Sequence, residues 1–340
     1  MKYVFKNMPL KNLQFQKVMV TTTARLHMGF IDLNGSAGRL FGSLGVALNS
    51  PTTQIEIAGS EKTVIEAKNQ LNVLNIVEKF TKALNLESSF SVKIHQNIPT
   101  HAGLGSGTQM ALAIGAGLNA LFDLNLCATQ LAAITNRGAR SGVGIGTFEQ
   151  GGLVIDGGRN LKSNQLPPII ARQIFPEDWP ILLILDDADQ GVFGDEELQA
   201  FETLPKAGLI NAQQLSHAVL MQALPAIVER DYVQFCRAIH TLQLATGQYF
   251  AAAQGGHYKS ATVASVLNYL DNKGVVGKGQ SSWGPTGFAI FDSVASADNM
   301  LVQLKQQFSA SHNSGFESLR FQIVYAKNTG ASIELIDIPK

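Results

Sequence analysis

The sequence has few cysteines, no net charge and no long apolar run. Two cysteines in 340 residues, Cys127 and Cys236, cannot build a disulfide framework. The 26 basic and 26 acidic residues balance, which excludes the broadly basic surface of nucleic-acid- and membrane-binding proteins, so neither partner is expected. No uncharged apolar run reaches ~18 residues and no signal-peptide core is recognisable, so we expect a cytoplasmic protein.

The length predicts two domains, because a single core rarely grows beyond roughly 250–300 residues. The chain has 340 residues, and the irregular stretch 159–180 contains four prolines. Prolines gather in linkers, so we place the domains at 1–175 and 176–340. Both halves mix strand and helix patterns without a regular βαβ alternation, which favours an α+β fold.

Local patterns predict the main elements of both halves. Alternating or β-branched runs indicate strands, and apolar residues at helical spacing indicate helices. Expected strands are 17–23, 52–58, 90–95, 152–156, 181–187, 286–292 and 320–326. Expected helices are 61–84, 108–123, 128–138 (closed by Gly138), 212–229, 231–254, 257–271 and 295–309.

Glycine is in slight excess, and its placement is uneven. Of 32 glycines, 23 fall in four windows, at 29–45, 103–117, 138–158 and 274–287. Clustered glycine indicates unusual backbone dihedrals or a backbone that approaches a ligand closely. We therefore predict that the four windows line one cleft.

The segment 98–109, IPTHAGLGSGTQ, precedes an apolar helix and has glycine at three alternate positions. With Ser106 or Thr108 as the cap, the first N–H groups of this helix suit a phosphate or pyrophosphate. The segment matches neither Walker A nor G-x-G-x-x-G, and a tight turn without a ligand is the alternative. His101, in the same loop, is a lesser candidate. The residues assigned to this anion site are Gly103, Leu104, Gly105, Ser106, Gly107 and Thr108.

A second polar segment begins at Arg25. Arg25 and His27 share one face of an extended chain, and Asp32 follows nearby. An arginine, a histidine and an acid can grip a carboxylate or phosphate and supply a proton, so these three are the candidate catalytic residues. Arg39 is a candidate for binding. The alternative is a surface ion pair beside a satisfied histidine.

Two arginines and several acids follow the anion loop. Arg137 and Arg140 lie three residues apart across a helix end and can converge on one anion, although cations also simply favour helix C-termini. The metal ligands are unknown; Asp32 and Glu149 are the candidates. The acidic runs at 186–189 and 195–197 are typical of strand and helix ends, with a metal role as the alternative.

The segment 278–287 places a tryptophan in a loop of small residues. Such a ring can stack on an aromatic substrate or cover a pocket, and the alternative is that it anchors a hairpin. The residues assigned to substrate binding here are Gln280, Ser281, Ser282 and Trp283.

These segments together resemble a known superfamily. Residues 99–106 match the Pro-x-x-x-Gly-Leu-Gly-Ser-Ser signature of the GHMP kinase superfamily, with Gly107 at the position of the second serine. Arg25-Leu-His27, Ile31-Asp-Leu-Asn-Gly-Ser36 and Gly279-Gln-Ser-Ser-Trp-Gly-Pro-Thr286 resemble one branch, the β-ribofuranosylaminobenzene 5′-phosphate synthase family of methanopterin biosynthesis. The resemblance implies a two-domain GHMP-kinase-like α+β fold.

The resemblance also implies a reaction between small molecules. In it, 5-phosphoribosyl 1-pyrophosphate and 4-aminobenzoate (or 4-hydroxybenzoate) give a C-riboside 5′-phosphate, CO2 and pyrophosphate. Magnesium is the expected cofactor, ATP, NAD and flavin are not expected, and a homodimer is expected. Arg25 would orient the carboxylate, and His27 or Asp32 would manage a proton or the metal.

One departure argues against phosphoryl transfer. Many superfamily kinases carry Ser-Gly-x-Asp, whereas this chain has Ser141-Gly-Val-Gly144. A kinase without that acid lacks a group that positions or deprotonates its substrate. An ATP-dependent small-molecule kinase and a non-catalytic metabolite sensor on the same fold remain the two alternatives.

Overall fold

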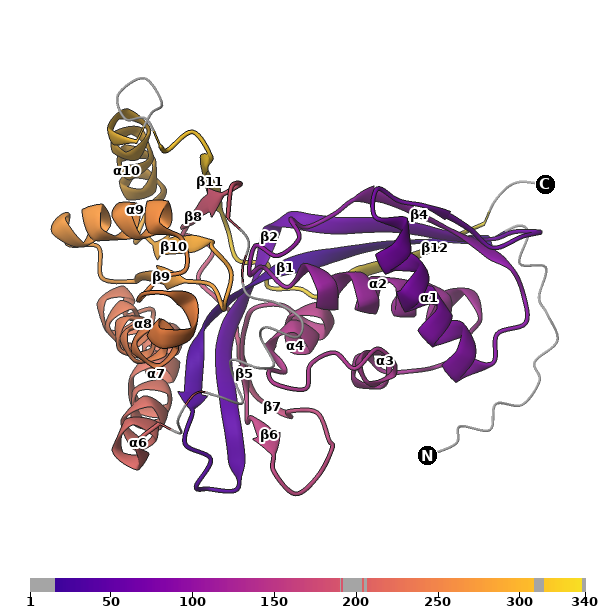
Figure 1. Cartoon of the computed structure of the whole chain (residues 1–340), viewed down its shortest axis with the longest axis horizontal. Coiled ribbons are helices and arrows are strands. Elements are labelled where there is room, and N and C mark those ends of the chain that lie inside the picture. The colour runs from indigo at the N-terminus through magenta and orange to yellow at the C-terminus, as the bar shows by residue number, and fades with distance from the viewer. Residues whose placement is uncertain (1–15, 190, 192–203, 205–206, 309–314, 338–340) are drawn as a thin grey trace.

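The computed structural model describes residues 16–189, 191, 204, 207–308 and 315–337 (Figure 1). Two sheets, one of eight strands and one of four, are each covered by helices. The predicted mixed α+β architecture is therefore confirmed. Within the described residues, no helix is both long enough and apolar enough to cross a membrane.

A long hairpin joins the two parts of the molecule. Strand β1 (Gln16–Asp32) pairs antiparallel with β2 (Arg39–Gly59), with irregularities after Thr23 and His27. The sequence predicted only 17–23 and 52–58 as strands. The halves of β1 and β2 nearer the hairpin turn are buried on both faces, so they lack the alternation of apolar and polar residues that marks a half-exposed strand.

The first sheet has the order β12-β1-β2-β4-β3, and β5 joins it through β2. Only β3 and β4 pair in parallel among the described strands. Strand β12 brings the end of the chain back beside β1, so this sheet takes residues from both sides of the proline-rich stretch. Its remaining strands are β3 (Val64–Glu66), β4 (Phe90–Gln96), β5 (Leu153–Asp156), β6 (Arg159–Asn160), β7 (Ile169–Gln173) and β12 (Ser332–Asp337).

Four helices lie beneath β1, β2 and β4 in Figure 1. They are α1 (Gln70–Leu84), α2 (Ser106–Leu121), α3 (Ala128–Ile134) and α4 (Val143–Gln150). Helices α2 and α4 pack against the sheet, and α1 and α3 pack against α2. Helix α2 is buried along most of its length, and Gly115 and Gly117 let it approach Phe80 and Ile57. These two glycines of the 103–117 window therefore serve packing.

Several predicted helix boundaries were wrong; the helix expected from residue 257, for example, begins at Ala261 with Ser260 as its N-cap. Helix α1 begins at Gln70 and not at residue 61, because Asn69 caps it by accepting a hydrogen bond from the Asn72 N–H, and β3 occupies the residues before it. Helix α3 ends at Ile134, with Thr135 as its C-cap. Gly138 does have a positive φ, of 81°, but it lies in the following turn.

The second sheet has the order β11-β8-β10-β9 and is antiparallel. Helix α8 packs on both β1 and β9, and the largest buried cluster includes Leu26, Leu48, Phe235 and Leu242, so one core spans both sheets. The strands are β8 (Ile181–Asp186), β9 (Lys278–Gln280), β10 (Gly287–Ile290) and β11 (Leu319–Val324). The helices are α6 (Leu209–Ala218), the π-helical η2 (Val219–Ala223), α7 (Leu224–Glu229), α8 (Tyr232–Gln254), α9 (Ala261–Asn272) and α10 (Val294–Gln307).

Candidate active site

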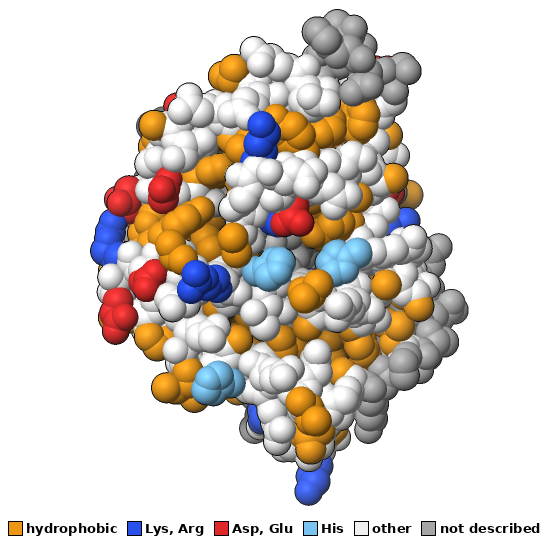
Figure 2. Space-filling view, turned by 90° about the vertical axis from the view of Figure 1, so that its left-hand side faces the viewer, with side chains coloured by type: hydrophobic (Ala, Val, Ile, Leu, Met, Phe, Trp, Pro, Cys, Tyr) orange, Lys and Arg blue, Asp and Glu red, His pale blue; other side chains and the backbone are white. Residues whose placement is uncertain are grey.

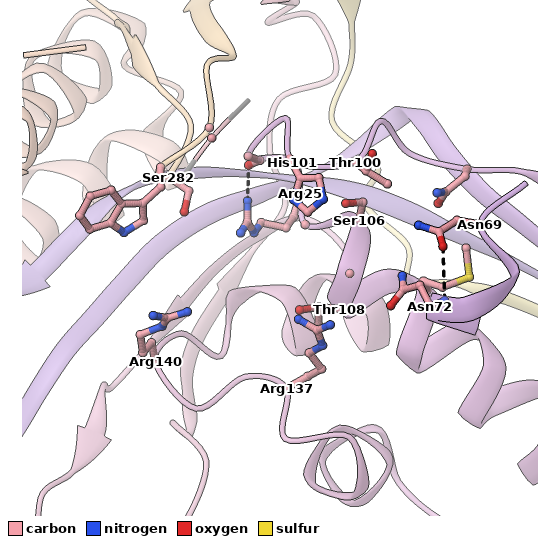
Figure 3. Close-up of a pocket in the computed structure, with 18 residues that line it drawn as sticks. Arg25, Asn69, Asn72, Thr100, His101, Ser106, Thr108, Arg137, Arg140 and Ser282 are labelled. Carbon is pink, nitrogen blue, oxygen red and sulfur yellow. Dashed lines mark hydrogen bonds between the residues drawn. The ribbon is translucent and has the colours of Figure 1, made fainter. Parts of the chain in front are cut away.

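A cavity of about 560 Å³ lies where the loop before α2, the turn before α4 and the loop after β9 meet (Figure 3). This volume is in the usual range for small-molecule sites, ~300–1,000 Å³. Its lining residues are Arg25, Asn69, Asn72, Asn97, Thr100, His101, Gly103, Gly105, Ser106, Gly107, Thr108, Met110, Arg137, Arg140, Gly191, Ser282, Trp283 and Gly284.

The loop before α2 and the loop after β9 touch backbone to backbone. A Cβ on Gly103 would lie 2.3 Å from the carbonyl oxygen of Ser281, and one on Gly284 would lie 2.2 Å from the nitrogen of Gly103. No side chain fits at either position without moving a backbone. Two segments about 180 residues apart in sequence thus form one wall of the cavity.

Strand β1 fixes the position of this glycine loop. The backbone N–H of Arg25 donates to Leu104 O (3.1 Å), and its guanidinium donates to Gly103 O. The Ser281 hydroxyl donates to the same Gly103 oxygen (2.8 Å) and accepts the backbone N–H of His27 (3.1 Å). Ser281 is fully buried and does not line the cavity, so it positions the loop and does not contact a ligand directly.

The N-terminus of α2 opens onto the cavity. Its N-cap is Gly105, at φ 81°, with no side-chain cap hydrogen bond, so the prediction that Ser106 or Thr108 caps the helix was wrong. A Cβ on Gly107 would lie 3.2–3.3 Å from the Arg137 guanidinium, which therefore lies over the first turn. The helix dipole and this cation together favour an anion here.

A second helix N-terminus borders the same cavity. Asn69 and Asn72, at the start of α1, both line it, together with Asn97 and Thr100. None of these four residues was predicted from the sequence. Asn69 had a usable signal, since asparagine directly before an apolar helical run is a typical N-cap. Nothing local to Asn97 or Thr100 indicated a place in the site.

The cavity is electropositive. Arg25, Arg137 and Arg140 line it, and none of the described lining residues is Asp or Glu. Figure 3 shows Arg140 toward Ser282 and Arg137 beside Thr108. Guanidinium groups match phosphate and carboxylate oxygens in a bidentate manner, so the cavity suits a ligand with more than one anionic group.

The aromatic and strained residues lie at this cavity too. Trp283 lines the cavity but is only 3% exposed. The centroid of its ring lies 4.2 Å from that of Phe250, so Trp283 also anchors the loop. His101 and Ser282 both line the cavity at positive φ, 59° and 55°. Partial burial lowers the pKa of His101. Backbone strain of this kind gathers at functional sites.

Two predicted catalytic residues do not line the cavity. His27 is 2% exposed, and burial, followed by the charge of Arg25, lowers its pKa to about 3. A histidine held neutral in this way is a poor proton carrier near pH 7, which argues against the proposed role. The Asp32 carboxylate accepts the N–H groups of Asn34 and Gly35 at the tip of the β1–β2 hairpin, which is a turn-forming role.

Besides Ser281, three further predicted binding residues lie outside the cavity. Arg39 donates to Gly157 O and Gly158 O and so ties the hairpin to the end of β5. The side chain of Leu104 is fully buried in the core. The Gln280 side chain donates to Ser282 O (3.0 Å) and so shapes the loop that carries Trp283.

No predicted metal ligand lies at the cavity in the described part of the chain. There, no cluster of three or more His, Cys, Asp or Glu could hold an ion, and neither Asp32 nor Glu149 lines the cavity. Asp186 accepts hydroxyl groups from Ser260 and Thr262, and Asp187 pairs with Arg320. The second acidic run, 195–197, lies outside the described residues.

The prediction of one cleft for all four glycine windows was wrong for one of them. Windows 103–117, 138–158 and 274–287 each contribute lining residues, but window 29–45 contributes none. Two of its glycines serve packing instead. A Cβ on Gly45 would lie 2.5 Å from Leu26 O, and one on Gly29 would lie 3.0 Å from Leu242.

Comparison with known proteins agrees with this geometry. Residues 72–150, which include the glycine loop, match the GHMP kinases N terminal domain. The chain is 33% identical to a beta-ribofuranosylphenol 5′-phosphate synthase of Archaeoglobus fulgidus, over 92% of this chain and 98% of that protein. A synthase of the same name from Methanocaldococcus jannaschii is also 33% identical, over 81% of this chain and 90% of its own length. The chain belongs to the β-ribofuranosylphenol 5′-phosphate synthase family.

The resemblance inferred from the motifs is thereby confirmed, and membership places the chain among enzymes. A homoserine kinase from Cytophaga hutchinsonii has the same fold, with a TM-score of 0.65 and coverage of 98% of this chain and 100% of that one. Its sequence identity is 15%, so this likeness shows the GHMP kinase fold alone.

Proposed function

We propose that the chain condenses 5-phosphoribosyl 1-pyrophosphate with 4-hydroxybenzoate or 4-aminobenzoate, releasing CO2 and pyrophosphate, in tetrahydromethanopterin biosynthesis. The observation that carries the proposal is the cavity itself, in which three arginines and two helix N-termini meet without a carboxylate among the described lining residues. The substrates together carry a 5′-phosphate, a pyrophosphate and a carboxylate, and this cavity offers donors for all three.

The glycine loop and Arg137 are the proposed site for a phosphate-bearing group. The first turn of α2 has no side-chain cap, and Arg137 lies over Gly107. A leaving pyrophosphate gains negative charge as its bond to the ribose breaks. Donors that already point at it lower the barrier, because they need no rearrangement at the moment of reaction.

The proposed bond changes balance without an external proton. The bond between ribose C1 and the pyrophosphate oxygen breaks, and the oxygen keeps the electron pair. The benzoate ring carbon that bears the carboxylate then bonds to C1. The carbon–carboxylate bond breaks next, and its electrons restore the aromatic ring as CO2 leaves. The chain has to align the two substrates, which is itself a large source of rate.

Arg25 is the proposed partner of the carboxylate, whereas Arg140 is proposed to bind the pyrophosphate together with Arg137. Arg25 lines the cavity while its guanidinium also donates to Gly103 O, and Arg140 lies toward Ser282 (Figure 3). A clamp on the carboxylate that is too tight would oppose CO2 loss, because the product lacks that charge. Orientation by a cation that also holds a backbone oxygen, as Arg25 does, fits this requirement.

Magnesium fits this cavity only as a companion of the substrate. Magnesium prefers carboxylate and phosphate oxygens, and the described lining offers only neutral oxygens, such as those of Ser106 and Thr108. We therefore propose that the ion enters as the magnesium complex of the pyrophosphate, whose own oxygens hold it.

Residue 144 supports a reaction without ATP, because it is glycine where many kinases of the superfamily have an aspartate. Gly144 packs under Thr108, where a Cβ would lie 3.2 Å from the threonine methyl, and Gln109 donates to Gly144 O (2.8 Å). A side chain at 144 would require Thr108 to shift by a few tenths of an ångström at the start of α2. Without that acid, the usual group that positions a kinase substrate is missing.

The direct test is the release of labelled CO2. Purified protein is incubated with magnesium, 5-phosphoribosyl 1-pyrophosphate and carboxyl-labelled 4-hydroxybenzoate or 4-aminobenzoate in parallel. Release that requires the pyrophosphate donor supports the proposal, and the faster benzoate identifies the substrate. A folded protein that releases no CO2 but forms ADP from ATP and a small alcohol is a kinase, and one that only binds ligand is a sensor.

A homodimer is a further part of the proposal. Figure 2 shows the outer face of the C-terminal helices, where apolar side chains lie between charged ones. Ile210 of α6 and Leu220 of η2 are 71% and 62% exposed. Light scattering of the purified chain gives its mass in solution. Loss of the dimer in an I210E/L220E variant would assign this face, and a monomeric wild-type protein would contradict the dimer.

A further inference from the structure

Asp156 is a buried carboxylate with no role in the reaction proposed above. It is the last residue of β5, is completely buried and does not line the cavity. Its contacts nevertheless reach the turn that carries Arg140. Burying a carboxylate away from water costs free energy unless hydrogen bonds or a partner charge compensate it, so the burial of Asp156 needs an explanation.

Both carboxylate oxygens of Asp156 accept hydrogen bonds. The backbone N–H of Gly142 donates to Oδ2 (2.8 Å), and the Ser141 hydroxyl donates to the same oxygen (3.2 Å). The backbone N–H of Gly158 donates to Oδ1 (2.8 Å). Two of these donors belong to residues 141–142, directly after Arg140.

The turn at 141–142 is held from its other side as well. A Cβ on Gly142 would lie 2.8 Å from Pro167 O and 3.1 Å from the Asp156 Cβ. The turn is therefore confined between β5 and residue 167, with the carboxylate as its hydrogen-bond anchor. The backbone of Arg140 leads directly into this turn. The direction in which the Arg140 side chain enters the cavity therefore depends on the hydrogen bonds from the turn to Asp156.

The ionisation of Asp156 carries a cost that the hydrogen bonds only partly offset. Burial raises the pKa of its carboxyl to about 6, against the opposing effect of the bonds from Gly158, Gly142, Ser141 and Ser43. Arg39 of β2 donates to the backbone oxygens of Gly157 and Gly158, the two residues that follow this carboxylate.

We propose that Asp156 is a positioning residue, which holds Arg140 in the cavity by anchoring the 141–142 turn and thereby sets the affinity for the anionic substrate. The proposal rests on the proposed function for the identity of that substrate. The placement of the turn rests on the hydrogen bonds alone.

The test compares Asp156→Asn with a matched buried carboxylate, Asp186→Asn. Asp186 also ends a strand and accepts a backbone N–H and two hydroxyls, but it lies outside the cavity lining. In D156N, an amide NH2 replaces one acceptor and faces an N–H donor. We expect inorganic pyrophosphate to bind about tenfold more weakly to D156N, as for a lost hydrogen bond to a charged group, and within about twofold of wild type to D186N.

A double-mutant cycle separates positioning from a general loss of structure. In an R140A background, D156N should weaken pyrophosphate binding no further, because the group it positions is already gone. Amide exchange at Gly142 should be faster in D156N whatever the ligand. If D156N does not fold, S141A, which removes one donor and keeps the carboxylate, should show the same pattern at a smaller size.

The outcomes distinguish this inference from the proposed function. Additive losses in the cycle, unchanged Gly142 exchange, or equal effects of D156N and D186N would overturn the positioning role. Wild-type protein that binds no pyrophosphate and releases no CO2 would overturn the proposed function, whereas the Gly142 exchange would still decide whether Asp156 anchors the turn.

Discussion

The glycine segments 103–107 and 29–45 look alike in sequence, but they serve different purposes. In the first, Gly103 lets two backbones touch, and the loop then delivers the uncapped start of α2 to a cavity lined with cations. In the second, Gly45 and Gly29 let β1, β2, α4 and α8 pack closely, and no residue of the window lines the cavity. Clustered glycine thus indicates close approach, and only a nearby helix N-terminus and cations turn that approach into a binding site.

The largest effect is expected at Gly103. In Gly103→Ala, the new Cβ would press on the Ser281 carbonyl at a φ of 77°, so the loop must move away from its position. We expect CO2 release to fall by at least about a hundredfold, since small misplacements of reacting groups cost that much. The matched control is Gly38→Ala in the other window, where φ is 79° but no atom lies within 4 Å. Equal losses of activity in both variants would remove the distinction between the two segments.

The next effect is expected at Arg137. Arg137→Ala removes the guanidinium that lies over Gly107, so KM for the pyrophosphate donor should rise about 10–100-fold. Arg39 lies outside the cavity, where it donates hydrogen bonds to two backbone oxygens. Arg39→Ala should therefore lower the melting temperature and leave KM unchanged. Steady-state kinetics with both variants checks the comparison, and the reverse pattern would place the anion site at the hairpin.

A smaller effect, on stability and its pH dependence, is expected at His27. Because its folded pKa is about 3, the unfolded chain binds a proton first as pH falls below ~6.5, and stability is lost through that window. Between pH 7.5 and 5 this residue should contribute a loss of about 2 kcal/mol. Urea unfolding of wild type and His27→Gln at the two pH values measures it. An equally steep loss in the variant would show that His27 is not the buried neutral group described here.

The smallest effect is expected at Asp32. In Asp32→Asn, the hairpin tip keeps an oxygen that can accept the N–H groups of Asn34 and Gly35, so we expect kcat and KM within about twofold of wild type and a small drop in melting temperature. A fall in kcat of a hundredfold or more would instead show that the hairpin tip takes part in the reaction.

The sequence allowed much of the fold and part of the site to be predicted. The mixed α+β class followed from the order of strand and helix patterns, and the superfamily from residues 99–106. Gly103, Arg137 and Arg140 could be found because glycine spacing and cations near a helix end are local signals, and Arg25 because it shares one face of an extended segment with His27. All four line the cavity.

The rest depended on distant contacts that leave no local signal. Ser281 looked like a binding residue because its loop is polar, yet its hydroxyl bonds to a carbonyl of a loop about 180 residues away. Asn97 and Thr100 enter the site only through the packing of their loop. His27 looked catalytic because its burial, which controls its pKa, depends on the tertiary structure.

The central claim is that the electropositive cavity before α2 binds the pyrophosphate donor. Calorimetric titration of 5-phosphoribosyl 1-pyrophosphate with magnesium into wild type, R137A and R39A tests it most directly. We predict that wild type and R39A bind with similar affinity and that R137A binds at least about tenfold more weakly. Wild-type affinity in R137A, together with lost binding in R39A, would contradict the account.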